Sequence, residues 1–162
     1  MPDGPRPAGP GYDDDFYAWT QHQAEVLRSL PTNDTRFDRE HVSEEIEDLG
    51  RNERAAVRSE IRLVLEHLLK LAYSPASDPR ADWTVSIINA RAELEDRLTA
   101  TLRRDVETNL EKLYERAREA AEAGLRRYAE SADAADLPPA CPYTLDQILG
   151  AGWYPEPPGS AS

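Results

Sequence analysis

The longest helical pattern in this chain limits what it can fold into, and it occupies residues 42–75, VSEEIEDLGRNERAAVRSEIRLVLEHLLKLAYSP. Apolar residues recur there at spacings of three and four, which predicts one long helix with an apolar stripe on one face. The stripe consists of Val42, Ile46, Leu49, Val57, Ile61, Val64, Leu68 and Leu71. Asp38 can cap the start of this helix, and the SPASDP segment ends it near Tyr73. Such a stripe has to be covered, so the chain is expected to form a bundle around this helix.

Other helical patterns lie on both sides of the long helix. Their boundaries are residues 13–15 and Pro31 for a first helix, Asp82 for the start of a third, and a break at residues 99–101 before a fourth. Thr144 and Gln147 have the spacing of a capping box, which predicts a short helix near the C-terminus. No segment alternates at period two for long enough to form a strand. The expected fold class is therefore all-α, a compact bundle of four main helices plus a short C-terminal helix, with Trp19 and Trp83 buried.

The ends of the chain differ from its middle in composition. Residues 1–11 are rich in proline and glycine, and residues 157–162 are again small or helix-breaking, so both are predicted to be disordered tails. Residues 12–156 are predicted to form a single helical domain, which is an ordinary size for one domain. Trp153 and Tyr154 precede the second tail and are too apolar to be left in solvent, so they are expected to pack on the bundle.

Composition and charge exclude several classes of protein. A formal net charge of −12 and a pI near 4.7 disfavour a general affinity for nucleic acids and for anionic membranes, both of which attract basic patches. A single cysteine, Cys141, excludes an internal disulfide framework and a cysteine-rich zinc site. No stretch reaches the roughly 20 apolar residues of a membrane-spanning helix, and no basic start followed by an apolar run marks a signal peptide. We therefore expect a cytoplasmic protein without a cofactor.

Four short motifs together indicate a family. They are YDDDFYAWTQHQAEVLR at 12–28, EEIEDLGRNE at 44–53, HLLKLAYSP at 67–75 and CPYTLDQIL at 141–149. With these motifs the chain resembles, from Tyr12 to Pro155, the bacterial family known as domain of unknown function 29. The resemblance implies a compact helical protein and carries no established activity. The chain differs from the usual family pattern at Leu71, where the family tends to have tryptophan, and at residues 100–102, where it lacks a Pro-Ser-Leu turn.

Three polar residues interrupt the apolar stripe of the long helix. Glu53, Glu60 and His67 follow one another at spacings of seven, so they drift by only about 20° per step along the stripe, and Glu45 lies at its margin. Polar side chains inside a buried stripe are costly unless they are paired. In a structural interpretation, Glu53 or Glu60 pairs with an inward-facing arginine such as Arg91, and His67 forms a hydrogen bond with a carboxylate or carbonyl.

A metal site is one functional interpretation of the same line. The candidate ligands are Glu53, Glu60 and His67, as in the di-iron carboxylate proteins built from helical bundles. Those proteins use Glu-x-x-His pairs, which this chain lacks. Seven residues also rise about 10.5 Å along a helix, too far for Glu60 and His67 to hold one ion. Further ligands would have to come from elsewhere, for example His22.

A nuclease is the other functional interpretation. The Arg62-x4-His67 spacing resembles that of the RNA-cleaving HEPN domains, also four-helix bundles, in which arginine and histidine flank an RNA phosphate. Two observations argue against it. Arg62 and His67 lie about 140° apart around the helix, and the chain is acidic.

The remaining candidates have plain structural interpretations. An arginine stripe opposite the apolar face, Arg51, Arg54, Arg58 and Arg62, is continued by acidic residues, which is typical of a solvated, ion-paired face. Cys141 has no activating base nearby in sequence and is interpreted as a packing residue.

The function that these patterns favour is a non-catalytic interaction or regulatory helical module. Its expected partner is another protein or a second copy of the chain, and neither a membrane nor a nucleic acid is expected. The alternative is an enzyme that uses the line of Glu45, Glu53 and His67, either metal-dependent or a HEPN-like ribonuclease with Arg62.

Overall fold

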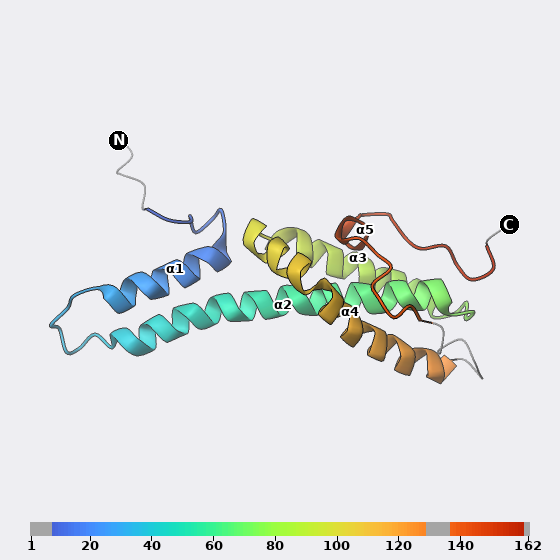
Figure 1. Ribbon diagram of the computed structural model, residues 1–162, viewed down its shortest axis with the longest axis horizontal. Coiled ribbons are helices and arrows are strands. Elements are labelled where there is room, and N and C mark those ends of the chain that lie inside the picture. The colour runs from blue at the N-terminus through green and yellow to red at the C-terminus, as the bar shows by residue number, and fades with distance from the viewer. Residues whose placement is uncertain (1–7, 129–136, 161–162) are drawn as a thin grey trace. The chain divides into compact units, whose positions relative to one another are not determined.

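The computed structural model describes residues 8–128 and 137–160, and these residues form helices and connecting loops without any strand (Figure 1). The helices are α1 (Phe16–Ser29), α2 (Arg39–Tyr73), α3 (Arg80–Arg97), α4 (Ala100–Tyr128) and α5 (Leu145–Leu149). The predicted all-α class, with four main helices and a short C-terminal one, is confirmed. Most of the first predicted tail and the last two residues of the second lie outside the described residues.

The predicted helix starts are mostly confirmed by their caps. The Asp15 carboxylate accepts a hydrogen bond from the backbone N–H of Ala18 at 2.9 Å at the start of α1, and the Asp38 carboxylate accepts one from the N–H of His41 at 3.2 Å in α2. Thr144 forms the predicted capping box at the start of α5. Each cap satisfies backbone donors that the helix itself leaves unpaired.

Helix α3 begins earlier than predicted. Its first residue is Arg80, whose N–H donates to the Ser77 carbonyl at 3.3 Å, and the N–H of Trp83 donates to the Pro79 carbonyl at 3.1 Å. Asp82 therefore lies in the first turn instead of capping it, a position where the helix dipole also favours an acidic side chain. The predicted break before α4 is confirmed, because the N–H of Leu102 donates to the Thr99 hydroxyl at 3.3 Å.

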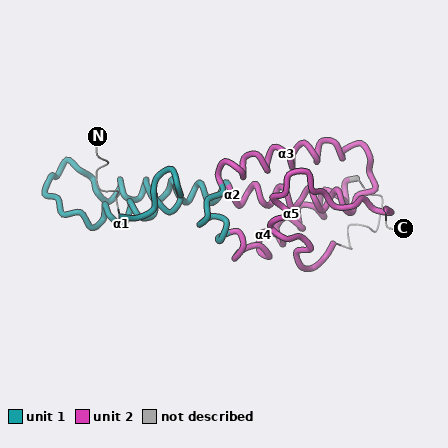
Figure 2. Tube along the Cα trace, turned by 90° about the horizontal axis from the view of Figure 1, so that it is seen from above, with its two compact units in different colours: residues 1–56, 98–105 teal, residues 57–97, 106–162 magenta. Residues whose placement is uncertain are grey.

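The chain divides into two compact units, which Figure 2 shows in different colours. Unit 1 consists of residues 1–56 and 98–105, and unit 2 consists of residues 57–97 and 106–162. Helices α2 and α4 each contribute to both units. The expectation of one domain over residues 12–156 stays a prediction.

Unit 2 has a conventional aliphatic core. The second half of α2 contributes Val57, Ile61, Val64, Leu65, Leu68 and Leu69, none of which exposes any surface. Trp83, Ile87 and Leu94 of α3 are also buried, so the prediction for Trp83 is confirmed. Removing this much apolar surface from water is the main stabilisation available to a helical bundle.

The segment after α5 packs on unit 2 through a buried arginine. Arg91, 8% exposed, donates to the carbonyls of Ile148 at 2.9 Å, Gln147 at 3.0 Å and Trp153 at 3.0 Å. The Trp153 ring meets Tyr143 edge-on at 5.6 Å between centroids, and the Arg91 guanidinium lies 5.2 Å from the Tyr154 ring centroid. The predicted packing of Trp153 and Tyr154 is confirmed. Arg91, the example given of an arginine that could pair with Glu53 or Glu60, donates to these backbone carbonyls instead.

Candidate functional site

Helix α1 and the first half of α2 form an antiparallel hairpin in unit 1 (Figure 1). Its contact surface consists of small residues, since Thr20, Ala24 and Ser43 are almost completely buried and Gly50 is buried too. Among the described residues of unit 1, only Ala24 and Leu102 are buried apolar side chains. The hairpin therefore closes without a core of large side chains.

Gly50 allows the two helices to approach closely. A Cβ added at Gly50 would lie 2.1 Å from the Thr20 hydroxyl oxygen and 2.6 Å from Gln21 Nε2. Gln21 Nε2 also donates to the Glu47 carbonyl at 3.2 Å, a direct hydrogen bond from one helix to the backbone of the other. Two helix backbones can come this close only where neither carries a bulky side chain.

One side of the hairpin is polar. Tyr17 and Arg28 lie on α1 about 60–100° around the helix axis from the contact residue Thr20. Arg54 donates to the Tyr17 hydroxyl at 3.2 Å, and Arg28 pairs with Glu47. These contacts fix the polar side, which also holds the ion pair of Arg51 with Asp48.

The opposite side of the hairpin is apolar. Its residues lie about 40–120° around each helix from the contact residues Thr20 and Gly50, in the direction opposite to the polar side. Because the two helices are antiparallel, these positions face the same side of the hairpin. Its residues are Phe16, Trp19, Val26 and Leu30 of the α1 region and Val42, Ile46 and Leu49 of α2. We call this set the hairpin face. Leu49 is 52% exposed, Leu30 44% and Val42 38%.

The hairpin face corrects two sequence predictions. Trp19, expected to be buried, is half-buried, and it contacts Tyr12 edge-on at 4.8 Å between ring centroids. Val42 and Leu49, placed in the buried stripe of α2, are exposed. The physical reason is that small residues occupy the side of α2 that meets α1, so the large apolar side chains of the stripe remain outside.

One end of the hairpin is covered within unit 1. The N–H of Thr101, at the start of α4, donates to the Asp15 carboxylate at 3.1 Å. Burial raises the pKa of Asp15, but hydrogen bonds from Ala18, Thr101 and Thr99 outweigh it, so the net pKa shift is downward. The carboxylate is thereby kept ionised.

Exposed acidic side chains lie in the first turns of α2, and one of them borders the hairpin face. Glu40, Glu44 and Glu45 are exposed on α2, and Asp38 lies at its start. Only Glu45 lies beside Val42 and Leu49; Glu40 and Glu44 lie on the opposite side of the helix. The Asp38 carboxylate lies 2.6 Å from His41 Nδ1; this hydrogen bond lowers the pKa of Asp38 and raises that of His41. Glu45, a candidate catalytic residue, is thus a surface group at the edge of an apolar face.

The candidate polar line of α2 extends over both units. Glu53 belongs to unit 1, whereas Glu60 and His67 belong to unit 2. His67 Nδ1 lies 2.8 Å from the carbonyl of Leu63, one turn earlier in the same helix, so this nitrogen carries a proton and donates it. Within residues 8–128 and 137–160, no three His, Cys, Asp or Glu side chains gather closely enough to hold a metal ion.

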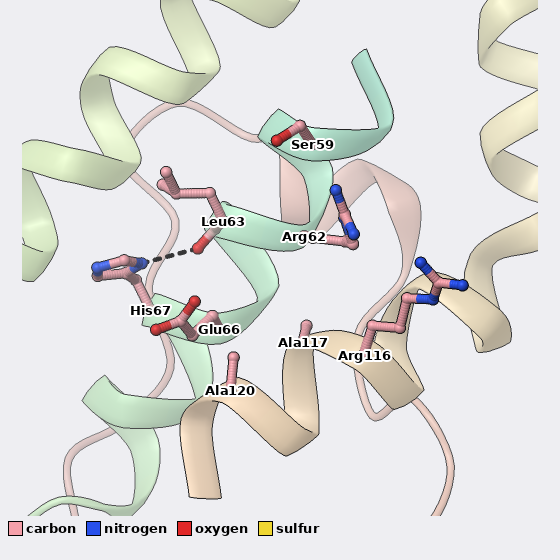
Figure 3. A pocket seen from close by; sticks show the side chains of 8 residues that line it. All are labelled: Ser59, Arg62, Leu63, Glu66, His67, Arg116, Ala117 and Ala120. Atoms are coloured by element: carbon pink, nitrogen blue, oxygen red, sulfur yellow. Dashed lines mark hydrogen bonds between the residues drawn. The ribbon is translucent and has the colours of Figure 1, made fainter. Parts of the chain in front are cut away.

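A pocket between α2 and α4 brings two predicted residues together within unit 2 (Figure 3). It has a volume of about 280 Å³ and is lined by Ser59, Arg62, Leu63, Glu66, His67, Arg116, Ala117 and Ala120. Arg62 and His67 line the same pocket although they lie on different faces of the helix, because the pocket extends over both faces. We call it the α2–α4 pocket.

Sequence reasoning missed Arg116 and misjudged Arg62. Arg62 was interpreted as part of a solvated stripe, yet its Nε is buried and has no hydrogen-bond partner in the described part of the chain. A signal was present in Ala117, Ala120 and Ala121, whose small side chains at helical spacing mark where α4 faces another helix.

The cysteine has the properties expected of a packing residue. Burial raises the pKa of the Cys141 thiol. The thiol also donates a hydrogen bond to the Tyr143 carbonyl at 3.3 Å, which favours its protonated form. The thiol therefore stays protonated at neutral pH, which makes it a poor nucleophile.

Comparison with known proteins identifies the family. A family model described as domain of unknown function DUF29 matches residues 12–154. The chain belongs to this family. It is also similar in structure to an α-helical protein of unknown function from Rhodospirillum rubrum, at 27% identity and a TM-score of 0.73, over 89% of this chain and 92% of that one. No match was found among curated proteins.

The DUF29 match is consistent with the helical fold, and the family description assigns no function. No helix among the described residues is both long and apolar enough to cross a membrane. The two candidate binding surfaces in the described residues are the hairpin face in unit 1 and the α2–α4 pocket in unit 2.

Proposed function

We propose that the protein is a non-catalytic interaction module, and that its hairpin face binds a basic amphipathic helix of another protein. The observation that carries this proposal is the one-sided exposure of large apolar side chains, of which Leu49, Leu30 and Val42 expose 52%, 44% and 38% of their surface. A contiguous apolar face on a folded protein is costly in water and is typical of a binding surface.

The form of the face favours a helical partner. Two antiparallel helices in close contact leave a shallow groove along their shared side, and an amphipathic helix can place its apolar residues along such a groove at spacings of three and four. Trp19 and Phe16, both half-buried, provide aromatic surface at one end, and aromatic side chains are enriched at the centres of interfaces.

Charge favours a basic partner over a second copy of the chain. The arginines of the hairpin are engaged on its polar side, Arg28 with Glu47 and Arg51 with Asp48. The exposed carboxylate of Glu45 lies beside the hairpin face, about 40–60° around α2 from Leu49 and Val42. A second copy would bring its own Glu45 against the same face, and the chain as a whole carries a net charge of −12, so a basic partner is favoured over a second copy.

Two synthetic peptides test this proposal. One is an amphipathic 18-residue Leu/Lys helix and the other its Leu/Glu counterpart, each labelled with a fluorophore and titrated with the full chain. We expect the Leu/Lys peptide to bind and the Leu/Glu peptide to bind at least tenfold more weakly. Equal affinity for the two peptides, or no binding of either, would contradict the proposal.

A matched pair of variants locates the binding. Leu49→Ser should weaken binding of the Leu/Lys peptide at least tenfold, whereas Ile88→Ser, at a position 53% exposed on α3 of unit 2, should leave it unchanged. Both variants remove similar apolar surface and keep the net charge. The general attraction between the acidic chain and the basic peptide is therefore the same in both and does not affect the comparison of their affinities. Sedimentation of the unliganded chain provides the second check, because a dimer that Leu49→Ser dissociates would replace the basic helix by a second copy.

A further inference from the structure

The α2–α4 pocket contains an unsatisfied cationic donor. Arg62 Nε is buried, and none of the residues that the structure describes accepts a hydrogen bond from it. Buried polar atoms are nearly always hydrogen-bonded, and a buried guanidinium N–H without an acceptor is especially unfavourable. An acceptor that entered the pocket would remove this cost once the Arg62 side chain turned its Nε toward the pocket.

The charge of the pocket is positive. Figure 3 shows the guanidinium groups of Arg62 and Arg116 on one side of the pocket and His67 on the other. The single carboxylate in the lining, Glu66, forms an ion pair with Lys70 of the same helix, and both side chains are largely buried, at 24% and 11% exposure. The charge of Glu66 is therefore matched within α2, and the two arginines remain for a ligand.

The size of the pocket suits a small anionic group. Ala117 and Ala120 line the α4 side, and their small side chains leave the space open. A volume of about 280 Å³ is near the lower limit of pockets that hold small ligands. Ser59 adds a hydroxyl to the lining.

From this geometry we propose that the α2–α4 pocket binds a phosphoryl group, with Arg62 and Arg116 donating hydrogen bonds to its oxygens. Planar guanidinium groups match the spacing of phosphate oxygens and hold them with two parallel bonds. A phosphate monoester carries nearly two negative charges at neutral pH, which two guanidinium groups can balance, whereas a carboxylate carries one. This site is separate from the hairpin face and does not depend on the proposed protein binding.

Inorganic phosphate, adenosine monophosphate and acetate, compared at equal ionic strength, test the proposal on the full chain. The most direct signal is the NMR resonance of Arg62 Nε–H. We expect it to shift in a saturable manner with phosphate or the nucleotide and to stay unchanged with acetate. A larger response to the nucleotide identifies a phosphate ester as the ligand class, and an equal response identifies the free ion. No shift with either phosphate, or the same shift with acetate, would overturn the proposal.

Variants separate binding from a structural role. Arg116→Gln should weaken phosphate binding at least tenfold, whereas Arg126→Gln, which removes the same charge from an exposed position of α4 outside the pocket, should leave it unchanged. Arg62→Met should abolish the rise in melting temperature that phosphate causes in the parent protein, yet leave the unliganded protein as stable as its parent or more stable, because it removes the unsatisfied donor. Equal phosphate affinity of Arg116→Gln and Arg126→Gln, or an unliganded Arg62→Met that is clearly less stable than its parent, would overturn it.

Discussion

The two units of this protein use the same helix in opposite ways. In unit 2, the second half of α2 completely buries Val57, Ile61, Val64, Leu65, Leu68 and Leu69. In unit 1, the first half of α2 buries Ser43 and Gly50 and exposes Val42 and Leu49. The apolar spacing is similar in both halves, so spacing alone does not decide which side of a helix is covered.

The size of the contact residues decides it. Small side chains let α1 and α2 approach until a donor of one helix reaches a backbone carbonyl of the other, as Gln21 Nε2 does with Glu47 at 3.2 Å. Large side chains hold helices further apart and fill the space between them. Unit 1 is therefore stabilised by close approach of the helix backbones, and unit 2 by the packing of large apolar side chains. The two kinds of contact predict different responses to mutation.

The largest expected effect concerns the polar anchor of unit 2. Arg91→Ala removes the donor shared by the carbonyls of Gln147, Ile148 and Trp153, and each carbonyl left buried without a partner costs about 1–3 kcal/mol. We expect a loss of about 3 kcal/mol or more in the free energy of unfolding, measured by urea denaturation.

Arg97→Ala is the control for that loss. Arg97 lies on the same helix and pairs with Glu93 at 3.1 Å, but its side chain is 38% exposed. A surface pair of this kind contributes less than about 1 kcal/mol. Equal losses for Arg91→Ala and Arg97→Ala would show that the three carbonyls are satisfied by water once the arginine is gone.

A second test compares two glycines inside helices. Gly50→Ala in unit 1 places a Cβ 2.1 Å from the Thr20 hydroxyl oxygen, which belongs to a short, stiff side chain, so the helices must separate. Overpacking of this kind costs about 1–3 kcal/mol. Gly124→Ala in unit 2 places its Cβ 2.6 Å from Lys70 Cε, the end of a flexible side chain that can move.

Helix propensity sharpens the glycine comparison. Alanine is favoured over glycine in a helix by about 1 kcal/mol, so Gly124→Ala should be neutral or stabilising, whereas Gly50→Ala should be destabilising. Urea denaturation of the two variants measures the difference. If both variants were equally stable, close backbone approach would not hold the hairpin together.

These contrasts show how far the sequence determined the fold. Helix positions followed from apolar spacing and from caps such as Asp15 and Thr144, because those signals are local. Exposure of Leu49 did not follow, because it depends on Thr20 and Gly50, which meet only in the folded chain. Arg116 was not predicted for the same reason, since the pocket that it shares with Arg62 joins residues more than fifty positions apart.

A third test compares the helix caps of the two units. Asp15→Ala removes the cap of α1 together with its hydrogen bond to Thr101 N–H, and Thr144→Ala removes the capping box of α5. Each should lower the free energy of unfolding by about 1 kcal/mol at pH 7. Urea denaturation measures both losses, and a loss several times larger for Asp15 would mean that its link to α4 outweighs the cap itself.

The smallest expected effect is the dependence of the Asp15 cap on pH. Hydrogen bonds hold the folded-state pKa of Asp15 below its usual value of 3.8 even though burial opposes them. The carboxylate therefore contributes its full stabilisation above the unfolded-state pKa and loses it as the pH falls through the folded-state pKa. We expect the stability difference between the parent and Asp15→Asn to be constant from pH 7 to about pH 5 and to shrink at lower pH.

All other carboxylates titrate in both proteins, so their contributions cancel in this difference. The deficit of Thr144→Ala involves no charge and should stay the same throughout, which makes it the internal reference. Urea denaturation at pH 7, 5 and 4, with the Asp15 carboxyl carbon followed by NMR down to pH 3, provides both quantities. An Asp15 carboxyl that titrates above 3.8, or an Asp15→Asn deficit that grows on acidification, would show that burial outweighs the hydrogen bonds and would reverse the sign of this prediction.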